Sequence, residues 1–319
     1  MSIALVTGLA GQDGSYLGER LTAEGHQVHG LVLDQDSARR VTASLPAATV
    51  HLADLADSAA IIDLIGRIRP DEIYNLGGIS SVGLAWSEPL ATGQISGLGA
   101  AAVCEGAWRL TQATGQPVRV LQASSSEIFG APATSPQDER TPIAPVNPYG
   151  AAKAYAHFIA QSYRARGLFA ATCILFNHES PRRPETFVTR KITSAVARIA
   201  KHGGELRLGN LDARRDWGWA PDYVDAMVRA IRHDQPDDFV VATGQSHSVA
   251  DFVAAAFAQV RIDDWRRLVT LDPALLRPAD APVLVGSPRK AERDLGWRRT
   301  LSFEQLVARM VDFDLAVAG

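Results

Sequence analysis

The chain alternates short apolar runs with longer segments of helical period through about its first 180 residues, and this pattern constrains the fold more than any other feature. The apolar runs are "IALVTG", "VHGLVL", "TVHLADL", "EIYNLGG", "VRVLQAS" and "AATCILFNH", and stretches such as "GSYLGERLTAEG" and "SAAIIDLIGRI" lie between them. Strands that are apolar on both faces and are separated by helices form a parallel sheet that helices cover on both sides. The sequence therefore predicts an α/β fold built on a doubly wound parallel sheet.

The pattern becomes less regular after "NHESPRRPETF" at 177–187. A helix is expected over about residues 187–202, a strand at 238–244 and a further helix within "VADFVAAAFAQV". We expect residues 1–178 to form mainly the sheet-bearing domain and residues 179–319 mainly a smaller, mixed α/β C-terminal lobe. Segments such as the strand near 238–244 are free to return to the first domain.

The composition argues against several classes of partner. Of 319 residues, 46% are hydrophobic and the formal net charge is −3, so the chain lacks the basic field that attracts nucleic acid or an anionic membrane. No apolar stretch reaches the ~18 residues of a membrane-spanning helix, and no basic leader precedes the first apolar run. Cys104 and Cys173 lie in apolar segments and are too few for a disulfide framework. We expect a soluble, cytoplasmic protein with both thiols buried.

Three glycines follow the first apolar run in "VTGLAGQDGSYLGERL". Gly8, Gly11 and Gly14 have a G-x-x-G-x-x-G spacing between the end of a strand and the start of a helix. Glycines let the backbone turn sharply and approach a pyrophosphate, whose charge the free N–H groups at the helix N-terminus stabilise. A structural turn would need one glycine rather than three, so the pattern favours a dinucleotide site in a Rossmann fold.

A tyrosine and a lysine are spaced for proton transfer in "NPYGAAKAYAHF". Tyr149 and Lys153 lie at i and i+4, and therefore on one face of a helix. An ammonium group beside a phenol stabilises the phenolate, and lowering the phenol pKa from about 10 towards 7 takes on the order of 4 kcal/mol. We expect Lys153 to lower the pKa of Tyr149, so that the phenol takes a proton from a substrate hydroxyl near neutral pH. The alternative is an exposed structural pair on a helix.

A polar cluster ends the fifth apolar run, where "QASSSEIFG" places Ser125, Ser126 and Glu127 directly after "VRVL". The carboxyl ends of parallel strands form the ligand crevice of such a sheet, so these side chains are expected beside Tyr149. A simple reductase needs only a serine, the tyrosine and the lysine. Glu127 is the additional group, and a carboxylate at this place can act as a second acid or base. Its alternative role is to cap a helix.

Long phrases along most of the chain resemble those of one enzyme family. "TGLAGQDGSYL", "RPDEIYNLG", "QASSSEIFG", "NPYGAAKAYA", "ILFNHESPRR" and "LGNLDARRDWGWAPDYVDAM" are similar to sequences of GDP-mannose 4,6-dehydratases, in the extended short-chain dehydrogenase/reductase superfamily. The resemblance implies an NAD(P)-dependent hydro-lyase of deoxysugar biosynthesis, which oxidises the sugar at C4, eliminates water across C5 and C6 and reduces C6. Tyr149 would take the O4 proton and Glu127 the C5 proton. Ser126 or Glu127 would assist the departure of water, and Ser125 and Lys153 complete the catalytic set.

The resemblance also implies binding roles. Cofactor contacts would fall, besides Tyr149 and Lys153, on Gly8, Gly11, Gln12, Asp13, Gly14, Asp54, Leu55, Leu76, Gly77, Ser80, His178 and Arg183. The nucleotide sugar, GDP-mannose by resemblance, would contact Ser80, Asn177, Val188, Lys191, Arg215 and Arg277. Arginine suits such a ligand because its planar guanidinium matches phosphate oxygens.

The chain departs from the family pattern after the second strand. Leu33 and Asp34 stand where an Arg-Arg pair is usual. Asp34 lies 20 residues after Gly14, and an acidic residue about that far along binds the ribose 2′-hydroxyl of NAD and repels the 2′-phosphate of NADP. The cofactor is therefore NADP by resemblance and NAD by local charge, and both stay open, although Arg39 and Arg40 could compensate for the loss.

Other functions stay open as well. Ile79, Ser81 and Ala91 replace residues that are usual near the sugar, so a 4,6-dehydratase for another nucleotide-linked hexose is one alternative. A related epimerase or 4-ketoreductase is a second, and a dinucleotide-binding sensor is a third. No metal site is expected, since the eight histidines are dispersed and the rings of His26 and His29 point to opposite faces of a strand. The resemblance implies a homodimer built on helices around 94–113 and 148–166, or a homotetramer.

Overall fold

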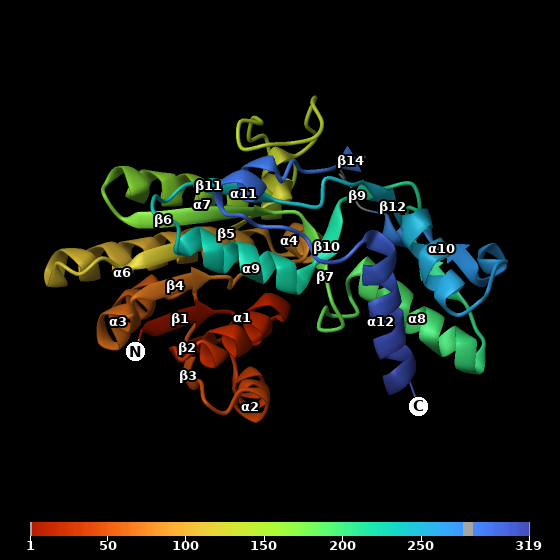
Figure 1. The fold of residues 1–319 in the computed structure, drawn as a ribbon, viewed down its shortest axis with the longest axis horizontal. Helices are drawn as coiled ribbons and strands as arrows, with labels where there is room; N and C mark the ends of the chain where they lie inside the picture. Colours follow the sequence, from red (N-terminus) through yellow and green to blue (C-terminus); the bar gives the residue numbers. More distant parts are fainter. Residues whose placement is uncertain (1, 277–282, 319) are drawn as a thin grey trace.

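The computed structural model describes residues 2–276 and 283–318, and a seven-stranded sheet forms its centre (Figure 1). The strand order is β11-β6-β5-β4-β1-β2-β3, and every neighbouring pair is parallel. The strands are β1 (Ile3–Thr7), β2 (Gln27–Val32), β3 (Thr49–Leu52), β4 (Glu72–Asn75), β5 (Arg119–Ser125), β6 (Phe169–Leu175) and β11 (Asp238–Val241). Because the order reverses between β1 and β4, this is a doubly wound Rossmann sheet. The predicted α/β fold is confirmed.

Helices cover both faces of this sheet. One face carries α1 (Gln12–Ala23), α2 (Gln35–Ser44) and α9 (Ala220–Ile231), and the other carries α3 (Ser58–Ile68), α6 (Gly99–Thr114) and α7 (Pro148–Ala165). Leu5 and Val6, adjacent on β1, enter the two opposite cores, because side chains alternate along a strand. This double burial explains the continuous apolar runs of the sequence. Cys104 and Cys173 are free and buried, as expected, and burial raises the pKa of the Cys104 thiol to about 12.

A smaller lobe holds α8 (Val188–His202), α10 (Val249–Gln259) and α12 (Phe303–Val317) around an apolar core of its own. Three small sheets contain β8 (Leu206–Leu208) with β13 (Val269–Leu271), β9 (Arg214–Arg215) with β12 (His247–Ser248) and β14 (Val283–Leu284), and β7 (Asn177–Glu179) with β10 (Trp217–Trp219). The helix expected at 187–202 is confirmed. Shorter helical segments are α4 (Val82–Ser87), α5 (Pro89–Thr92), α11 (Arg289–Asp294) and a π-helix at Gly93–Leu98.

The chain returns to the main sheet after it has entered the smaller lobe. The strand expected near 238–244 is β11, which pairs with β6 at the edge of the sheet. α9 buries Tyr223 and Met227 in the core of the main sheet, and Trp297 packs in the same core. Both halves of the sequence therefore build this sheet. A division into domains at residue 178 stays a prediction.

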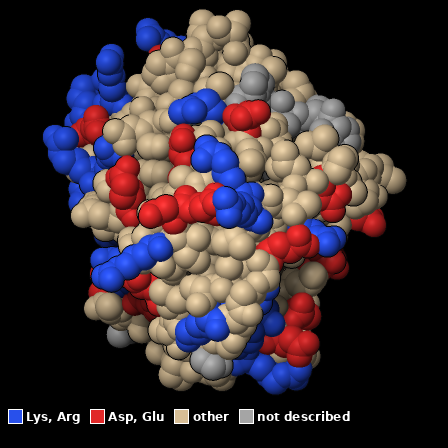
Figure 2. All heavy atoms as spheres, turned by 90° about the vertical axis from the view of Figure 1, so that its right-hand side faces the viewer, with Lys and Arg blue, Asp and Glu red and all other residues tan. Residues whose placement is uncertain are grey.

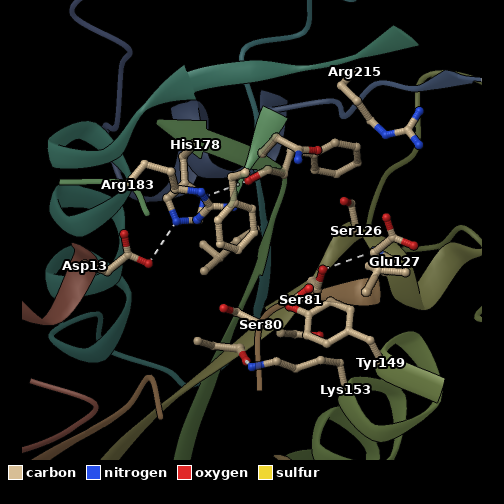
Figure 3. Close-up of a pocket in the computed structure, with 18 of the residues that line it drawn as sticks. Asp13, Ser80, Ser81, Ser126, Glu127, Tyr149, Lys153, His178, Arg183 and Arg215 are labelled. Atoms are coloured by element: carbon tan, nitrogen blue, oxygen red, sulfur yellow. Dashed lines mark hydrogen bonds and ion pairs between the residues drawn. The ribbon is translucent and has the colours of Figure 1, made fainter. Parts of the chain in front are cut away.

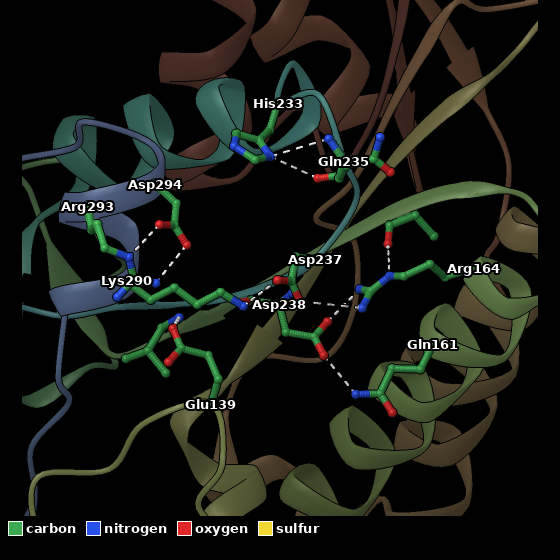
Figure 4. Close-up of polar contacts among 12 residues, drawn as sticks. Glu139, Gln161, Arg164, His233, Gln235, Asp237, Asp238, Lys290, Arg293 and Asp294 are labelled. Carbon is green, nitrogen blue, oxygen red and sulfur yellow. Dashed lines mark hydrogen bonds and ion pairs between the residues drawn. The ribbon is translucent and has the colours of Figure 1, made fainter.

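Side chains close part of the open edge of β11 (Figure 4). Glu139 accepts a hydrogen bond from the backbone N–H of Val240 at 2.8 Å. Asp238 accepts one from Arg164 of α7 at 2.6 Å, and Lys290 donates to the carbonyl oxygen of Asp238 at 2.8 Å. Unpaired groups on an edge strand can pair with another chain, so this cluster protects the sheet from edge-to-edge association.

Charged side chains of both signs are interspersed over the face that Figure 2 shows. Within residues 2–276 and 283–318, no helix combines the length and apolar character needed to cross a bilayer. The same part of the chain holds no group of three or more His, Cys, Asp or Glu side chains arranged to bind a metal.

His29 and His51 form a half-buried pair on β2 and β3, with Nδ1 of His29 2.9 Å from Nε2 of His51. Burial lowers the pKa of both rings from the ordinary 6.5. Below about pH 6.5 the unfolded chain therefore binds protons more readily than the folded protein, and stability that is present above that pH is lost as the pH falls. We expect the melting temperature of His51→Gln to fall less between about pH 7 and pH 5 than that of the wild type. His202→Gln, at an exposed position, should follow the wild type. Equal pH dependence of all three proteins would contradict the prediction.

Candidate active site

The three glycines lie in the turn between β1 and α1 and in the first turn of α1, and a different structural reason favours glycine at each position. Gly8 has a φ of +71°, a left-handed conformation that favours glycine. A Cβ at Gly14 would lie 2.3 Å from the carbonyl oxygen of Gly8, so α1 packs here only without a side chain. Gly11 is the N-cap of α1 and has an extended backbone that other residues also adopt. Its missing side chain leaves the helix N-terminus accessible to a phosphate group.

A cavity lies beside this turn, where the sequence predicts contacts with the adenosine half of a dinucleotide. Its lining comes from the end of β2, from the segments that follow β1, β2, β3 and β4, from α2 and from the π-helix: Gly8, Ala10, Leu31, Val32, Leu33, Ser37, Ala53, Asp54, Leu55, Gly77, Gly78, Ile79 and Ile95. The structure thus brings Asp54, Leu55 and Gly77 to the same place as Gly8. A Cβ at Gly77 would lie 2.7 Å from the Leu55 side chain, so this side chain packs directly against the backbone of residue 77. These residues fit a nicotinamide dinucleotide.

Asp34 is the N-cap of α2 and directly follows Leu33, which lines this cavity. Its Oδ1 accepts the backbone N–H of Ser37 at 2.7 Å, and this hydrogen bond lowers the pKa of the carboxyl group. Arg39 pairs with Asp36, and Arg40 donates to Oγ of Ser37 at 3.0 Å. The cap therefore holds an ionised carboxylate between Leu33 and Ser37, two residues of the cavity lining.

The main cavity brings together the residues predicted to be catalytic, which lie in separate segments of the sequence (Figure 3). Ser125, Ser126 and Glu127 come from the end of β5 and the 3-10 turn Ser126–Phe129, and Tyr149 and Lys153 come from the first turns of α7. All five line the cavity, together with Asp13, Leu76, Ser80, Asn177, His178, Arg183 and Arg215. The carboxyl ends of β4, β5 and β6 meet here, as expected for a ligand crevice.

Tyr149 does not have the lowered pKa that its spacing from Lys153 predicts. Burial raises the pKa of the phenol, a hydrogen bond with Ser125 opposes this rise, and the nearby carboxylate of Glu127 adds to it. Nζ of Lys153 lies 6.0 Å from the centroid of the ring and donates to the carbonyl oxygen of Ala123 at 3.0 Å. Burial lowers the pKa of Lys153 itself to about 8. The prediction is therefore wrong for the protein alone, because desolvation outweighs a charge at this distance.

The loop after β5 holds the carboxylate of Glu127 at the cavity wall (Figure 3). Oγ of Ser125 accepts the backbone N–H of Glu127 at 3.3 Å and caps the 3-10 turn, so capping falls to Ser125 rather than to Glu127. Oε2 of Glu127 accepts a hydrogen bond from Nδ2 of Asn147 at 2.8 Å. A carboxylate and a phenol thus line one cavity, where they can exchange protons with two neighbouring atoms of a ligand.

A buried ion pair forms the side of the cavity nearest α1. Nδ1 of His178 donates to the carbonyl oxygen of Phe176 at 2.7 Å, and Nε2 lies 2.9 Å from the carboxylate of Asp13. Both partners accept hydrogen bonds, so the ring is protonated on both nitrogens. Burial opposes this charge, but Asp13 raises the pKa of His178 above its ordinary value. Gln12 donates to the carbonyl oxygen of His178 at 3.1 Å, and Arg183 adds a second cation to the same wall.

A second cavity continues from the first into the smaller lobe. Asn177 and Arg215 line both, and the second is further lined by Val188, Leu208, Gly209, Asn210, Ala213, Trp217, Val249, Leu275 and Leu276. Lys191, one turn beyond Val188 on α8, is not among the described residues that line either cavity. Arg277, also predicted to bind substrate, lies outside the described residues.

Two polar residues that support the site were not predicted. Asp216, fully buried next to Arg215, accepts backbone N–H groups of Thr243 at 2.8 Å and Gly244 at 2.9 Å, which ties the strand of Arg215 to the end of β11. Asn147 bridges α7 and Glu127. An asparagine before a proline is a helix-start signal, but its contact with Glu127, 20 residues away, depends on the fold.

A family model described as GDP-mannose 4,6 dehydratase matches residues 5–310. The chain belongs to the GDP-mannose 4,6-dehydratase family. One relative, GDP-mannose 4,6 dehydratase 2 of Arabidopsis thaliana, is 43% identical over 334 residues, which cover 99% of this chain and 87% of that protein. The match to this dehydratase family includes both lobes and all the described cavity residues, so the resemblance read from the sequence is confirmed.

Two solved structures share the fold of this dehydratase family member. UDP-glucose 4-epimerase from Thermus thermophilus, in complex with NAD, has a TM-score of 0.85 and 23% identity and covers 99% of this chain and 99% of its own. RMD from Pseudomonas aeruginosa, complexed with NADPH, has a TM-score of 0.80 and 23% identity, with the same coverage. At such identities the likeness establishes the fold alone, and the two proteins hold different nicotinamide dinucleotides.

Proposed function

We propose that this protein converts GDP-mannose to GDP-4-keto-6-deoxymannose. The observation that carries the proposal is the position of Glu127 beside Tyr149 in one cavity, because an epimerase or a 4-ketoreductase needs no second acid or base there. Membership of the GDP-mannose 4,6-dehydratase family supports the same reaction and substrate.

The chain supplies the groups that move protons. Tyr149, hydrogen-bonded to Ser125, accepts the proton of the sugar O4. Glu127 takes the proton from C5 and passes it to the oxygen that leaves C6 as water, and Ser126, buried at the same wall, can donate a hydrogen bond to that oxygen. As C6 is reduced, C5 takes up a proton from solvent, and this proton balances the O4 proton that Tyr149 accepted and releases. When bound, an oxidised nicotinamide supplies a hydride acceptor for C4, a donor for C6 and a positive charge that favours the tyrosinate.

We infer that the cofactor lies across the two cavities of the main sheet. The turn at 8–14, Asp54, Leu55 and Gly77 would hold its adenosine and pyrophosphate groups. Lys153, His178 and Arg183 would lie towards its nicotinamide half. Their positive charges attract and partly neutralise the negative charge of the dinucleotide in a buried site.

The nucleotide sugar would lie across the main cavity and the second one. Arg215 lines both, so its guanidinium is suited to bind the diphosphate between a sugar near Glu127 and a base in the pocket around Leu208 and Trp217. The test is turnover of GDP-, UDP-, CDP- and dTDP-hexoses, followed by the mass loss of one water. We expect GDP-mannose to react fastest. If another nucleotide-linked hexose reacts faster, the proposed substrate is wrong. If none of them reacts, the proposed dehydratase function is wrong.

We propose NAD rather than NADP as the cofactor, since Asp34 and Asp36 place two carboxylates in the segment between Leu33 and Ser37, two residues that line the adenosine cavity. Arg39 is already paired with Asp36 and Arg40 with Ser37. A 2′-phosphate beside the ionised Asp34 would meet like charge, whereas a 2′-hydroxyl can donate to it.

Removing the charge of Asp34 should therefore weaken the discrimination against NADP. Asp34→Ser keeps an N-cap for α2, because serine caps helices well. We expect the ratio of the Kd for NADP to that for NAD to fall by about tenfold or more. Asp57→Ser, which removes a carboxylate that caps α3 through Ala60, should leave the ratio unchanged. An unchanged ratio in Asp34→Ser would contradict the proposal of NAD.

We also propose a homodimer that acts in the cytoplasm. Large apolar side chains are exposed along the helices of one region, namely Leu84, Trp86, Leu90, Leu98 and Phe158. Such a cluster suits self-association. The free, buried thiols fit a reducing compartment. Light scattering at micromolar concentration should give the mass of a dimer; a tetramer would extend the proposal, and a monomer would contradict it.

A further inference from the structure

Asn147 makes two hydrogen bonds that fix the orientation of its amide. It is 6% exposed and is the N-cap of α7. The backbone N–H of Gly150 lies 2.8 Å from Oδ1, and because an N–H can only donate, this atom has to be the carbonyl oxygen. The amide nitrogen is therefore the atom that lies 2.8 Å from Oε2 of Glu127, and it donates to that oxygen. One side chain starts the helix that carries Tyr149 and also holds the carboxylate beside it.

The first turns of α7 and the loop that carries Glu127 are also joined by other contacts. A Cβ at Gly150 would lie 2.4 Å from the carbonyl oxygen of Glu127, so the helix comes this close only because residue 150 is glycine. Nζ of Lys153 donates to the carbonyl oxygen of Ala123 on β5 at 3.0 Å. Loss of the bond between Asn147 and Glu127 would therefore release the carboxylate while the helix stays in place.

The hydrogen bond from Asn147 fixes the orientation of the Glu127 carboxylate. In the described part of the chain, Asn147 is the one donor hydrogen-bonded to this carboxylate. A hydrogen bond to a carboxylate is roughly twice as strong as one between neutral groups, and it favours one orientation of the acceptor. A residue that must take a proton from carbon needs this fixed orientation, because its oxygen has to lie close to that proton.

We propose that Asn147 is a positioning residue for the elimination step, holding the Glu127 carboxylate in the orientation that takes the C5 proton of the sugar. The inference rests on the proposed dehydratase function. Oxidation at C4 depends on Tyr149 and Lys153. Tyr149 is hydrogen-bonded to Ser125 and Lys153 to the carbonyl oxygen of Ala123, so neither contact involves the amide nitrogen of Asn147. Removing the donor should therefore slow elimination and spare oxidation.

Two variants separate this donor from the helix cap. Asn147→Asp has the same shape and caps a helix well, but it places an oxygen where the N–H donor was. Asn147→Ser keeps a cap and is too short to reach Glu127 in the same way. Both should melt within about 4 °C of the wild type, whereas Asn147→Ala, which loses cap and donor together, should melt lower.

The wild-type conversion of GDP-mannose is measured first, so that failure of the proposed function is seen separately from failure of this inference. For Asn147→Asp we expect kcat to fall by about 10²-fold with KM within about threefold of the wild type. Deuterium uptake at C5 from D2O should slow, and the absorbance of reduced nicotinamide should persist during turnover. Asn147→Ser should show the same changes to a smaller extent.

A crystal structure of Asn147→Asp supplies a measurement that does not depend on turnover, and it should show the Glu127 carboxylate turned away from residue 147. Three results would overturn the proposal: a wild-type kcat in Asn147→Asp, an unmoved Glu127 in its crystal structure, or an equal loss of oxidation and elimination. The last result would mean that Asn147 acts only through the fold of α7.

Discussion

Replacing Glu127 with glutamine is expected to lower the rate of GDP-mannose dehydration by about 10³-fold while oxidation at C4 continues. Glutamine has the shape of glutamate, and its carbonyl oxygen can accept the hydrogen bond of Asn147, so the cavity should keep its form. An amide cannot take the C5 proton. Because Tyr149 and Lys153 are unchanged, the substrate should still be oxidised, and reduced nicotinamide should accumulate with little deuterium at C5 when the reaction runs in D2O.

Glu139→Gln is the matched control for this substitution. Glu139 is a half-buried glutamate 12 residues further along the same loop, and its Oε1 accepts the N–H of Val240 at the edge of the sheet, outside the cavity (Figure 4). Its variant should turn over at the wild-type rate. A wild-type rate in Glu127→Gln would contradict the proposed dehydratase function and favour that of an epimerase or a 4-ketoreductase.

Replacing Tyr149 with phenylalanine should lower turnover by about 10³-fold or more, and it should stop the reaction before C4 is oxidised. The phenol is the group hydrogen-bonded to Ser125 that can accept the O4 proton, and phenylalanine removes it with little change of volume. No reduced nicotinamide should accumulate, in contrast to Glu127→Gln. The two variants therefore separate the first proton transfer from the second.

Tyr163→Phe controls for the loss of a tyrosine hydroxyl on the same helix. The hydroxyl of Tyr163 donates to Glu105 at 2.5 Å, away from the cavity, and this variant should keep the wild-type rate. If Tyr149→Phe still oxidises its substrate at C4, another residue accepts the O4 proton and the assignment of Tyr149 fails.

The local sequence pattern was sufficient to predict the strands of the sheet and the segments that form the site. Side-chain direction repeats every two residues in a strand and about every 3.6 in a helix, so the apolar runs predicted the strands and their two covered faces. Ser125 and Glu127 could be placed at the cavity because the end of a buried parallel strand leads into the crevice. Gly8 and Gly14 could be recognised because a sharp turn into a helix requires residues without side chains.

Tertiary structure alone decided the order of the strands and the charge states within the site. β11 pairs with β6 in the sheet, although the smaller lobe begins between these two strands in the sequence. Their pairing depends on which edge of the sheet the chain reaches when it returns from the smaller lobe. Lys153 lies on the expected helix face, yet its Nζ binds Ala123 and the pKa of Tyr149 rises. The contact of Asn147 with Glu127 has the same origin. Burial, and the distances between groups on separate segments, set these properties, and no local pattern of residues encodes them.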